Sequence, residues 1–86
     1  MSESNVIVLD VRTPEEIKQG KIGNAIEIDF KSNGFDKKIA ELDRDKTYLV
    51  YCAGGYRSSK ACKKMSKKGF SKLYNLEGGY SSWEAK

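Results

Sequence analysis

The residues with the clearest capacity for chemistry form one continuous segment, 51–58 (YCAGGYRS). Cys52 is a potential nucleophile, two glycines follow it closely, and Arg57 adds a fixed positive charge. Glycines permit the backbone conformations in which successive N–H groups point at one anion. Such donors, together with a nearby cation, lower the pKa of a thiol. The segment therefore predicts a reactive thiolate inside an anion-binding loop.

The flanking elements place Cys52 at a junction between a strand and a helix. The apolar and aromatic run at 47–52 predicts a buried strand, and residues 57–68 predict the longest helix of the chain. Gly69 is expected to end that helix as a C-terminal cap. The helix would direct its first N–H groups and the positive end of its dipole at the thiol, which favours the ionised form.

Strands and helices alternate along the rest of the chain. Thr13 and Pro14 are typical of a helix start, as N-cap and first helical residue. The predicted strands are 6–11, 25–28, 47–52 and 73–76, and the predicted helices are 14–20, 35–42, 57–68 and 80–85. This order predicts an α/β fold over residues 1–86, a single domain with a small, mainly parallel sheet flanked by helices on both faces.

Three loops are expected to meet at one edge of this sheet, because ligands of open parallel sheets bind outside the carboxyl ends of the strands. The first loop follows Asp10, the second contains Cys52, and the third contains Gly78 and Gly79. Asp10 can accept hydrogen bonds from neighbouring loops and Arg12 can pair with an acid, so both are expected to support the site structurally. The two glycines would let the last loop approach its rim closely.

Composition narrows the class of protein. The chain has two cysteines and no histidine, which excludes a cysteine-protease triad and gives no reason to expect a metal or another cofactor. The polar first residues do not resemble a signal peptide, and no apolar run reaches membrane-spanning length. We therefore expect a cytoplasmic protein with no membrane partner, and in that compartment free thiols rather than a Cys52–Cys62 disulfide.

The net charge of +4 comes largely from lysines. Lys60, Lys63, Lys64 and Lys67 recur at helical spacing on one face of the predicted helix 57–68, and Cys62 lies on the opposite, apolar face. We interpret the lysines as a solvated stripe rather than a nucleic-acid site, and Cys62 as a small core residue. Trp83 is likewise expected in the core. The positive charge would help attract a small anionic substrate.

Three blocks of the chain, in order, resemble the rhodanese-like sulfurtransferase family in its single-domain form. Residues 9–16 (LDVRTPEE) are similar to the family's opening signature, 51–58 to its active-site loop, and 76–83 (LEGGYSSW) to its closing signature. Two departures stand out. Residues 21–25 (KIGNA) replace a His-Ile-Pro-Gly-Ala segment, and the family's extra N-terminal strand and helix are missing or reduced to residues 1–5, which would leave a sheet edge less covered.

The resemblance implies a two-step sulfur transfer through a persulfide on Cys52. The thiolate would take the outer sulfur of a donor such as thiosulfate, and cyanide or a thiol, including a protein thiol, would remove it. Substrate would be bound by the loop residues Ala53, Gly54, Gly55, Tyr56 and Arg57. Arg57 would both lower the Cys52 pKa and dock the anionic donor, while Tyr56 would shape access or simply pack.

Two other functions remain open on the sequence. The domain would be a sulfur-carrying or regulatory binding module if it turned thiosulfate over poorly. It would be a small phosphatase or arsenate reductase if the loop served a tetrahedral anion. Four residues separate Cys52 from Arg57, one fewer than in the related phosphatase loops, so the loop length favours a sulfur atom.

Overall fold

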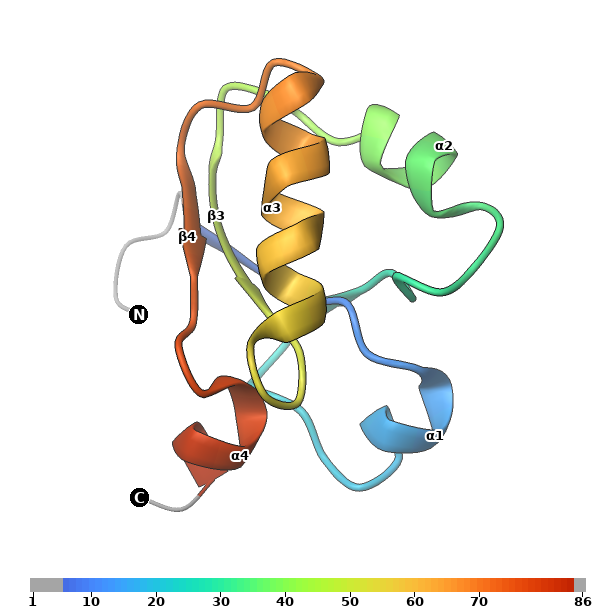
Figure 1. Cartoon of the computed structure of the whole chain (residues 1–86), viewed down its shortest axis with the longest axis vertical. Helices are drawn as coiled ribbons and strands as arrows, with labels where there is room; N and C mark the ends of the chain where they lie inside the picture. The colour runs from blue at the N-terminus through green and yellow to red at the C-terminus, as the bar shows by residue number, and fades with distance from the viewer. Residues whose placement is uncertain (1–5, 85–86) are drawn as a thin grey trace.

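The computed structural model describes residues 6–84 as four strands alternating with four helices (Figure 1). The strands are β1 (Val6–Asp10), β2 (Ile26–Glu27), β3 (Thr47–Tyr51) and β4 (Leu73–Asn75). The helices are α1 (Pro14–Ile17), α2 (Phe35–Ala40), α3 (Tyr56–Lys67) and α4 (Gly79–Glu84). Residues 1–5, assigned above to a reduced N-terminal strand and helix, lie outside the described residues.

The strands form one sheet in the order β2-β1-β3-β4, and every neighbouring pair is parallel. The central pair is in register over five residues, from Val6 opposite Thr47 to Asp10 opposite Tyr51. Parallel pairing brings the carboxyl ends of β1 and β3 to the same edge of the sheet. The α/β fold predicted from the sequence is confirmed.

One face of the sheet carries the core. Side chains that alternate along β1 and β3 pack against α2 and α3, as the period of two along a strand requires. The fully buried members include Leu9, Tyr48, Val50 and Met65. Figure 1 shows α3 running alongside β3 and β4, with α2 on its other side. This packing fixes the start of α3 relative to the end of β3.

The opposite face is less completely covered. A groove of about 530 Å³ lies there, lined by apolar side chains that include Val8, Leu49, Leu76 and Trp83. The expectation that Trp83 is a core residue is wrong, because its side chain is 45% exposed. It lies on α4, which covers one end of this face and stacks Trp83 on Tyr80.

The helix ends follow from local sequence. Thr13 caps α1: its hydroxyl accepts from the Glu16 amide, and the Glu16 carboxylate accepts from the Thr13 amide, a capping box. Gly69, at φ +100°, follows the last turn of α3, and the Phe70 amide donates to the Met65 carbonyl. The helix ends predicted from the sequence lie close to the observed ones, although α1 already ends at Ile17.

In the part of the chain that the structure describes, no helix is long and apolar enough to cross a membrane.

Candidate active site

Cys52 directly follows β3 and begins the loop that leads into α3. Its side chain is 1% exposed. The Gly55 amide donates to Cys52 Sγ at 3.1 Å, and the Ser58 amide donates at 3.4 Å. Gly55 is at φ +100°, a left-handed conformation that turns the chain back on the sulfur. The predicted arrangement of strand, glycine loop and helix start is present.

These donors control the ionisation of the thiol. Burial raises the pKa of Cys52, but hydrogen bonds from Ser58 and from the Gly55 and Gly54 amides outweigh it, so the pKa is lowered from its usual value of 9.0. All of these groups belong to the loop or to the first turn of α3. The backbone around Cys52 therefore stabilises a thiolate, as a helix N-terminus does for other anions.

Ser58 joins this loop to β4. It is fully buried, and its hydroxyl lies 2.5 Å from Asn75 Oδ1 and 3.2 Å from the Gly55 carbonyl oxygen. Asn75, the last residue of β4, donates from Nδ2 to the same carbonyl at 3.4 Å. The carboxamide of Asn75 thus holds the turn that presents the Gly55 amide to Cys52.

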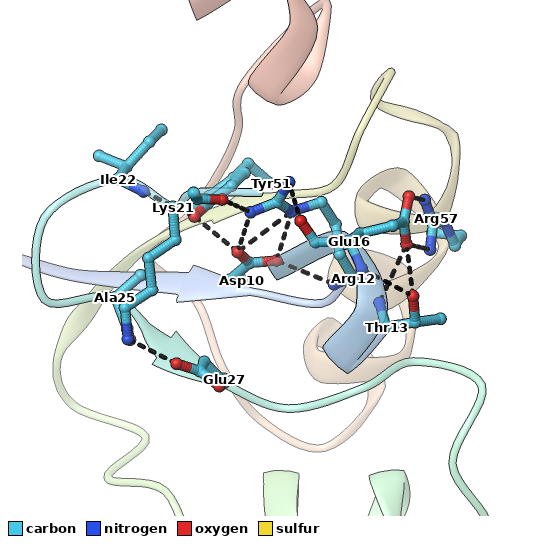
Figure 2. Close-up of polar contacts among 11 residues, drawn as sticks. Asp10, Arg12, Thr13, Glu16, Lys21, Ile22, Ala25, Glu27, Tyr51 and Arg57 are labelled. Atoms are coloured by element: carbon cyan, nitrogen blue, oxygen red, sulfur yellow. Dashed lines mark hydrogen bonds and ion pairs between the residues drawn. The ribbon is translucent and has the colours of Figure 1, made fainter. Parts of the chain in front are cut away.

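Arg57 is paired with an acid from α1. Arg57 Nη1 donates to Glu16 Oε1 at 2.7 Å and Nη2 donates to Oε2 at 2.8 Å, which makes a bidentate ion pair (Figure 2). The hydrogen bonds from Arg57 lower the pKa of Glu16 to about 2. The Arg57 guanidinium also interacts favourably with the charge on Cys52. Arg57 therefore adds positive potential at the loop, while its two terminal nitrogens each donate to Glu16.

Asp10 and Arg12 form a buried pair behind the loop. Arg12 Nη2 donates to Asp10 Oδ2 at 2.8 Å and to the Gly20 carbonyl at 2.6 Å, and the two side chains are 3% and 0% exposed. The Tyr51 hydroxyl donates to Asp10 at 2.7 Å and accepts from the Ile22 amide at 3.0 Å. Figure 2 shows this network linking the ends of β1 and β3 to the segment after α1. The network connects parts of the fold to one another, and the supporting role of Asp10 and Arg12 stays a prediction.

The first turn of α4 lies directly against the Cys52 loop. The Tyr80 amide donates to the Cys52 carbonyl at 2.8 Å, and the Ser81 amide donates to the Ala53 carbonyl at 3.1 Å. A Cβ built on Gly79 would lie 2.6 Å from the Ala53 carbonyl oxygen, and on Gly78 it would collide with Ser82. Only glycine fits this approach at Gly79.

The remaining predicted residues border the site. Tyr56 is 71% exposed, and Lys60 Nζ lies 4.7 Å from the centre of its ring. Cys62 is half-buried against the core, where burial raises the pKa of its thiol. Both cysteines are free. Among residues 6–84, no group of three His, Cys, Asp or Glu side chains is arranged to hold a metal ion.

Sequence reasoning missed Glu16, Ser58, Asn75 and Tyr51 as parts of the site. Glu16 lies in the first turn of a predicted helix, and nothing in the local sequence reveals a partner 41 residues away. Ser58 follows the arginine directly and was within reach of prediction, since the helix start directs its amide at Cys52. Asn75 and Tyr51 depend on the pairing of strands, which the sequence does not specify.

The whole chain, residues 1–86, matches the family model of the rhodanese-like domain. The protein belongs to the rhodanese-like domain family. A sulfurtransferase of Allochromatium vinosum is 33% identical over 79 residues, which are 92% of this chain and 72% of that protein. A crystal structure of a rhodanese-related protein from Thermoplasma volcanium superposes with a TM-score of 0.85 at 40% identity, covering 94% of this chain and 78% of the other.

The same domain also matches part of longer proteins. A tRNA uridine(34) hydroxylase of Cytophaga hutchinsonii is 41% identical over 78 residues, but these make up 87% of this chain and only 25% of the hydroxylase. Membership of the rhodanese-like family and sulfurtransferase relatives therefore support an enzyme of this superfamily, while the relatives differ in the reactions their names describe.

Proposed function

We propose that this rhodanese-like domain is a sulfurtransferase that carries sulfane sulfur on Cys52. The observation that carries the proposal is the environment of Cys52 Sγ, which accepts amide hydrogen bonds from Gly55 and Ser58 and has a lowered pKa. A thiolate is the form of cysteine that attacks sulfur. The same donors can stabilise a persulfide anion in the same place, because its terminal sulfur also carries the charge.

The first step loads the protein. The Cys52 thiolate attacks the outer sulfur of the donor, a new S–S bond forms, and the donor's own bond to that sulfur breaks with its electron pair. With thiosulfate, the products are the Cys52 persulfide anion and sulfite, so that three negative charges stand on each side. No proton and no external electron is needed, in keeping with a site that lacks histidine.

The second step removes the bound sulfur from Cys52. A nucleophile, cyanide in an assay or a thiolate in the cell, attacks the terminal sulfur of the persulfide. The S–S bond to Cys52 breaks and the Cys52 thiolate is restored. The product that leaves is thiocyanate or a new persulfide. The amides of Gly55 and Ser58 stabilise Cys52 as the leaving group, which lowers the barrier to this step as well.

Sulfur suits this loop better than phosphate. Cys52 is 1% exposed, so a donor must present a small terminal atom to reach it. Two Arg57 donors that would bind a tetrahedral anion, one on each terminal nitrogen, are bonded to Glu16. A phosphatase or arsenate reductase is therefore the less favoured function. A carrier module remains the alternative, because it would form the same persulfide without turning it over.

Substitution of Cys52 by serine tests the function. We expect Cys52→Ser to lose thiocyanate formation from cyanide and a sulfane donor, and Cys62→Ser to keep it, because only Cys52 lies in the loop. A stable persulfide in the native protein without thiocyanate formation would favour the carrier module. Turnover that survives in Cys52→Ser would contradict the proposal.

A further inference from the structure

Arg57, the charged residue at the end of the Cys52 loop, is paired with Glu16 rather than left free to bind a substrate. Both terminal nitrogens of Arg57 donate to Glu16, at 2.7 and 2.8 Å. The Arg57 side chain is 17% exposed and that of Glu16 is 33% exposed, so the pair is partly shielded from water. Figure 2 shows the carboxylate facing the guanidinium edge-on. In this geometry one N–H of each terminal nitrogen is used by Glu16, and the carboxylate neutralises the charge that would attract a sulfonate or sulfate group.

We propose that Glu16 determines donor specificity by withholding Arg57 from dianionic donors, so that the site favours organic persulfides over thiosulfate. The inference rests on the proposed sulfurtransferase function and specifies its donor class. A thiosulfate ion brings two negative charges to the loop and leaves as dianionic sulfite. The persulfide of an uncharged thiol brings one charge and leaves as a monoanionic thiolate.

The other side chains of the loop add no positive charge to that of Arg57, which Glu16 neutralises. Ala53, Gly54, Gly55 and Tyr56 carry no cationic group. Two lysines are engaged elsewhere: Lys60 lies over the Tyr56 ring, and Lys21 is paired with Glu27. The amides of Gly55 and Ser58 donate to Cys52 Sγ itself. A dianion would thus approach a thiolate with little compensating charge.

The carboxylate of Glu16 is fixed in position by α1. Its Oε1 also accepts from the Thr13 amide and the Thr13 hydroxyl, each at 3.0 Å. A capping box tolerates glutamine as well as glutamate. Glu16→Gln therefore keeps the cap of α1 and removes the charge that holds Arg57, which makes it a specific test rather than a disruption of the fold.

The matched control is Glu15→Gln. Glu15 stands in the same first turn, is exposed, and loses the same charge. For each protein, the rate of persulfide formation on Cys52 is followed by intact mass with two donors, thiosulfate and the persulfide of 2-mercaptoethanol, and the Cys52→Ser variant gives the background. Cyanide is left out, so that only the loading step is measured.

We expect the native protein to load faster from the organic persulfide than from thiosulfate. In Glu16→Gln the ratio of thiosulfate to organic persulfide rates should rise about tenfold, the value of one charge-assisted hydrogen bond to the donor. Glu15→Gln should leave the ratio unchanged.

Three results would overturn the inference: both rates changing together in Glu16→Gln, an equal change of the ratio in Glu15→Gln, or a lower thiosulfate rate in Glu16→Gln. The last would mean that the ion pair itself builds the donor site. If neither donor loads Cys52 in the native protein, the proposed function fails instead, and the two failures are distinguishable.

Discussion

At the scale of single residues, the site depends on backbone donors more than on side-chain charge. The Cys52 sulfur accepts from the amides of Gly55 and Ser58, while Arg57 pairs with Glu16. The second cysteine provides an internal comparison. Cys62 lies against the core without such donors, and burial raises the pKa of its thiol. The same side chain thus has opposite properties at two positions because of its surroundings.

The first prediction concerns the ionisation of the two thiols. Cys52 should titrate below its usual value of 9.0 and Cys62 above it. The ultraviolet absorbance of the thiolate, followed against pH, measures both without requiring a reagent to enter the loop. The native curve minus that of Cys52→Ser isolates one thiol, and the native curve minus that of Cys62→Ser isolates the other. Coincident midpoints would refute this account of the loop.

The second prediction concerns the Glu16–Arg57 pair and acid. Pairing lowers the pKa of Glu16 in the folded protein from 4.5 to about 2. The stabilisation it gives is therefore fully present above the unfolded-state pKa and is lost as the pH falls through the folded-state pKa.

Native protein should therefore be more stable than Glu16→Gln at neutral pH, and the difference should shrink as the pH falls from about 4.5 to about 2. Urea unfolding of both proteins across this range measures it. A stability difference that stays constant with pH would show that the carboxylate charge does not stabilise the fold.

At the scale of elements, three chain segments position the Cys52 loop. The junction of β3 and α3 supplies the sulfur and its donors, α1 supplies Glu16, and the start of α4 closes over the loop through Gly79. In Figure 1 the loop lies at the same end of the molecule as α1 and α4. The site is therefore sensitive to how tightly α4 packs against the loop.

The third prediction tests this packing with two glycines. Gly79 and Gly23 both have positive φ, +61° and +50°, but a Cβ would contact the Cys52 loop only at Gly79, and nothing within 4 Å at Gly23. Gly23→Ala should cost only the backbone strain, about 1–2 kcal/mol of unfolding free energy. Gly79→Ala should cost more by about 1–3 kcal/mol, because overlapping atoms must move.

Only Gly79→Ala should also shift the Cys52 titration, since only that substitution displaces the carbonyls of Cys52 and Ala53. Urea unfolding and the absorbance titration, run on both variants, measure the two effects. Equal losses of stability with an unshifted titration in Gly79→Ala would show that α4 does not control the loop.

At the scale of the whole molecule, the buried network of Asp10, Arg12 and Tyr51 joins segments that are distant in the sequence. It connects the ends of β1 and β3 to Gly20 and Ile22, and the Arg12 guanidinium also lies 4.3 Å from the centre of the Tyr80 ring on α4. The loops that carry the site are thereby attached to one another as well as to the sheet.

The fourth prediction concerns this network. Arg12→Ala leaves the Asp10 carboxylate buried without its partner, and we expect a loss of about 3–5 kcal/mol of unfolding free energy. The double variant Asp10→Asn/Arg12→Met removes both charges and keeps much of the volume, so it should regain part of that loss. Urea unfolding of the two variants and the native protein provides the comparison. If the double variant lost as much stability as Arg12→Ala or more, the two charges would not act as a pair.

The sequence was sufficient for what depends on local pattern. Thr13 and Pro14 predict the start of α1, Gly69 predicts the end of α3, and the run before Cys52 predicts β3. It was not sufficient for contacts that require the register of the sheet. Asn75 reaches Gly55 only because β4 pairs with β3, and Arg57 faces Glu16 only because β1 and β3 are adjacent.

Trp83 shows a further limit. Its size and apolar character suggest burial, but α4 leaves it on the rim of a groove on the less covered face. Whether an apolar side chain near a chain end is buried depends on what else covers that face, and local pattern does not contain this information.

The central claim is that Cys52 carries sulfur as a persulfide, and intact mass spectrometry tests it most directly. Native protein is treated with thiosulfate and, in parallel, with the persulfide of 2-mercaptoethanol, and it is then freed of donor and weighed. We predict a gain of one sulfur atom in the native protein and in Cys62→Ser, its loss on addition of cyanide, and no gain in Cys52→Ser. An unchanged mass with both donors, or an equal gain in Cys52→Ser, would contradict the account.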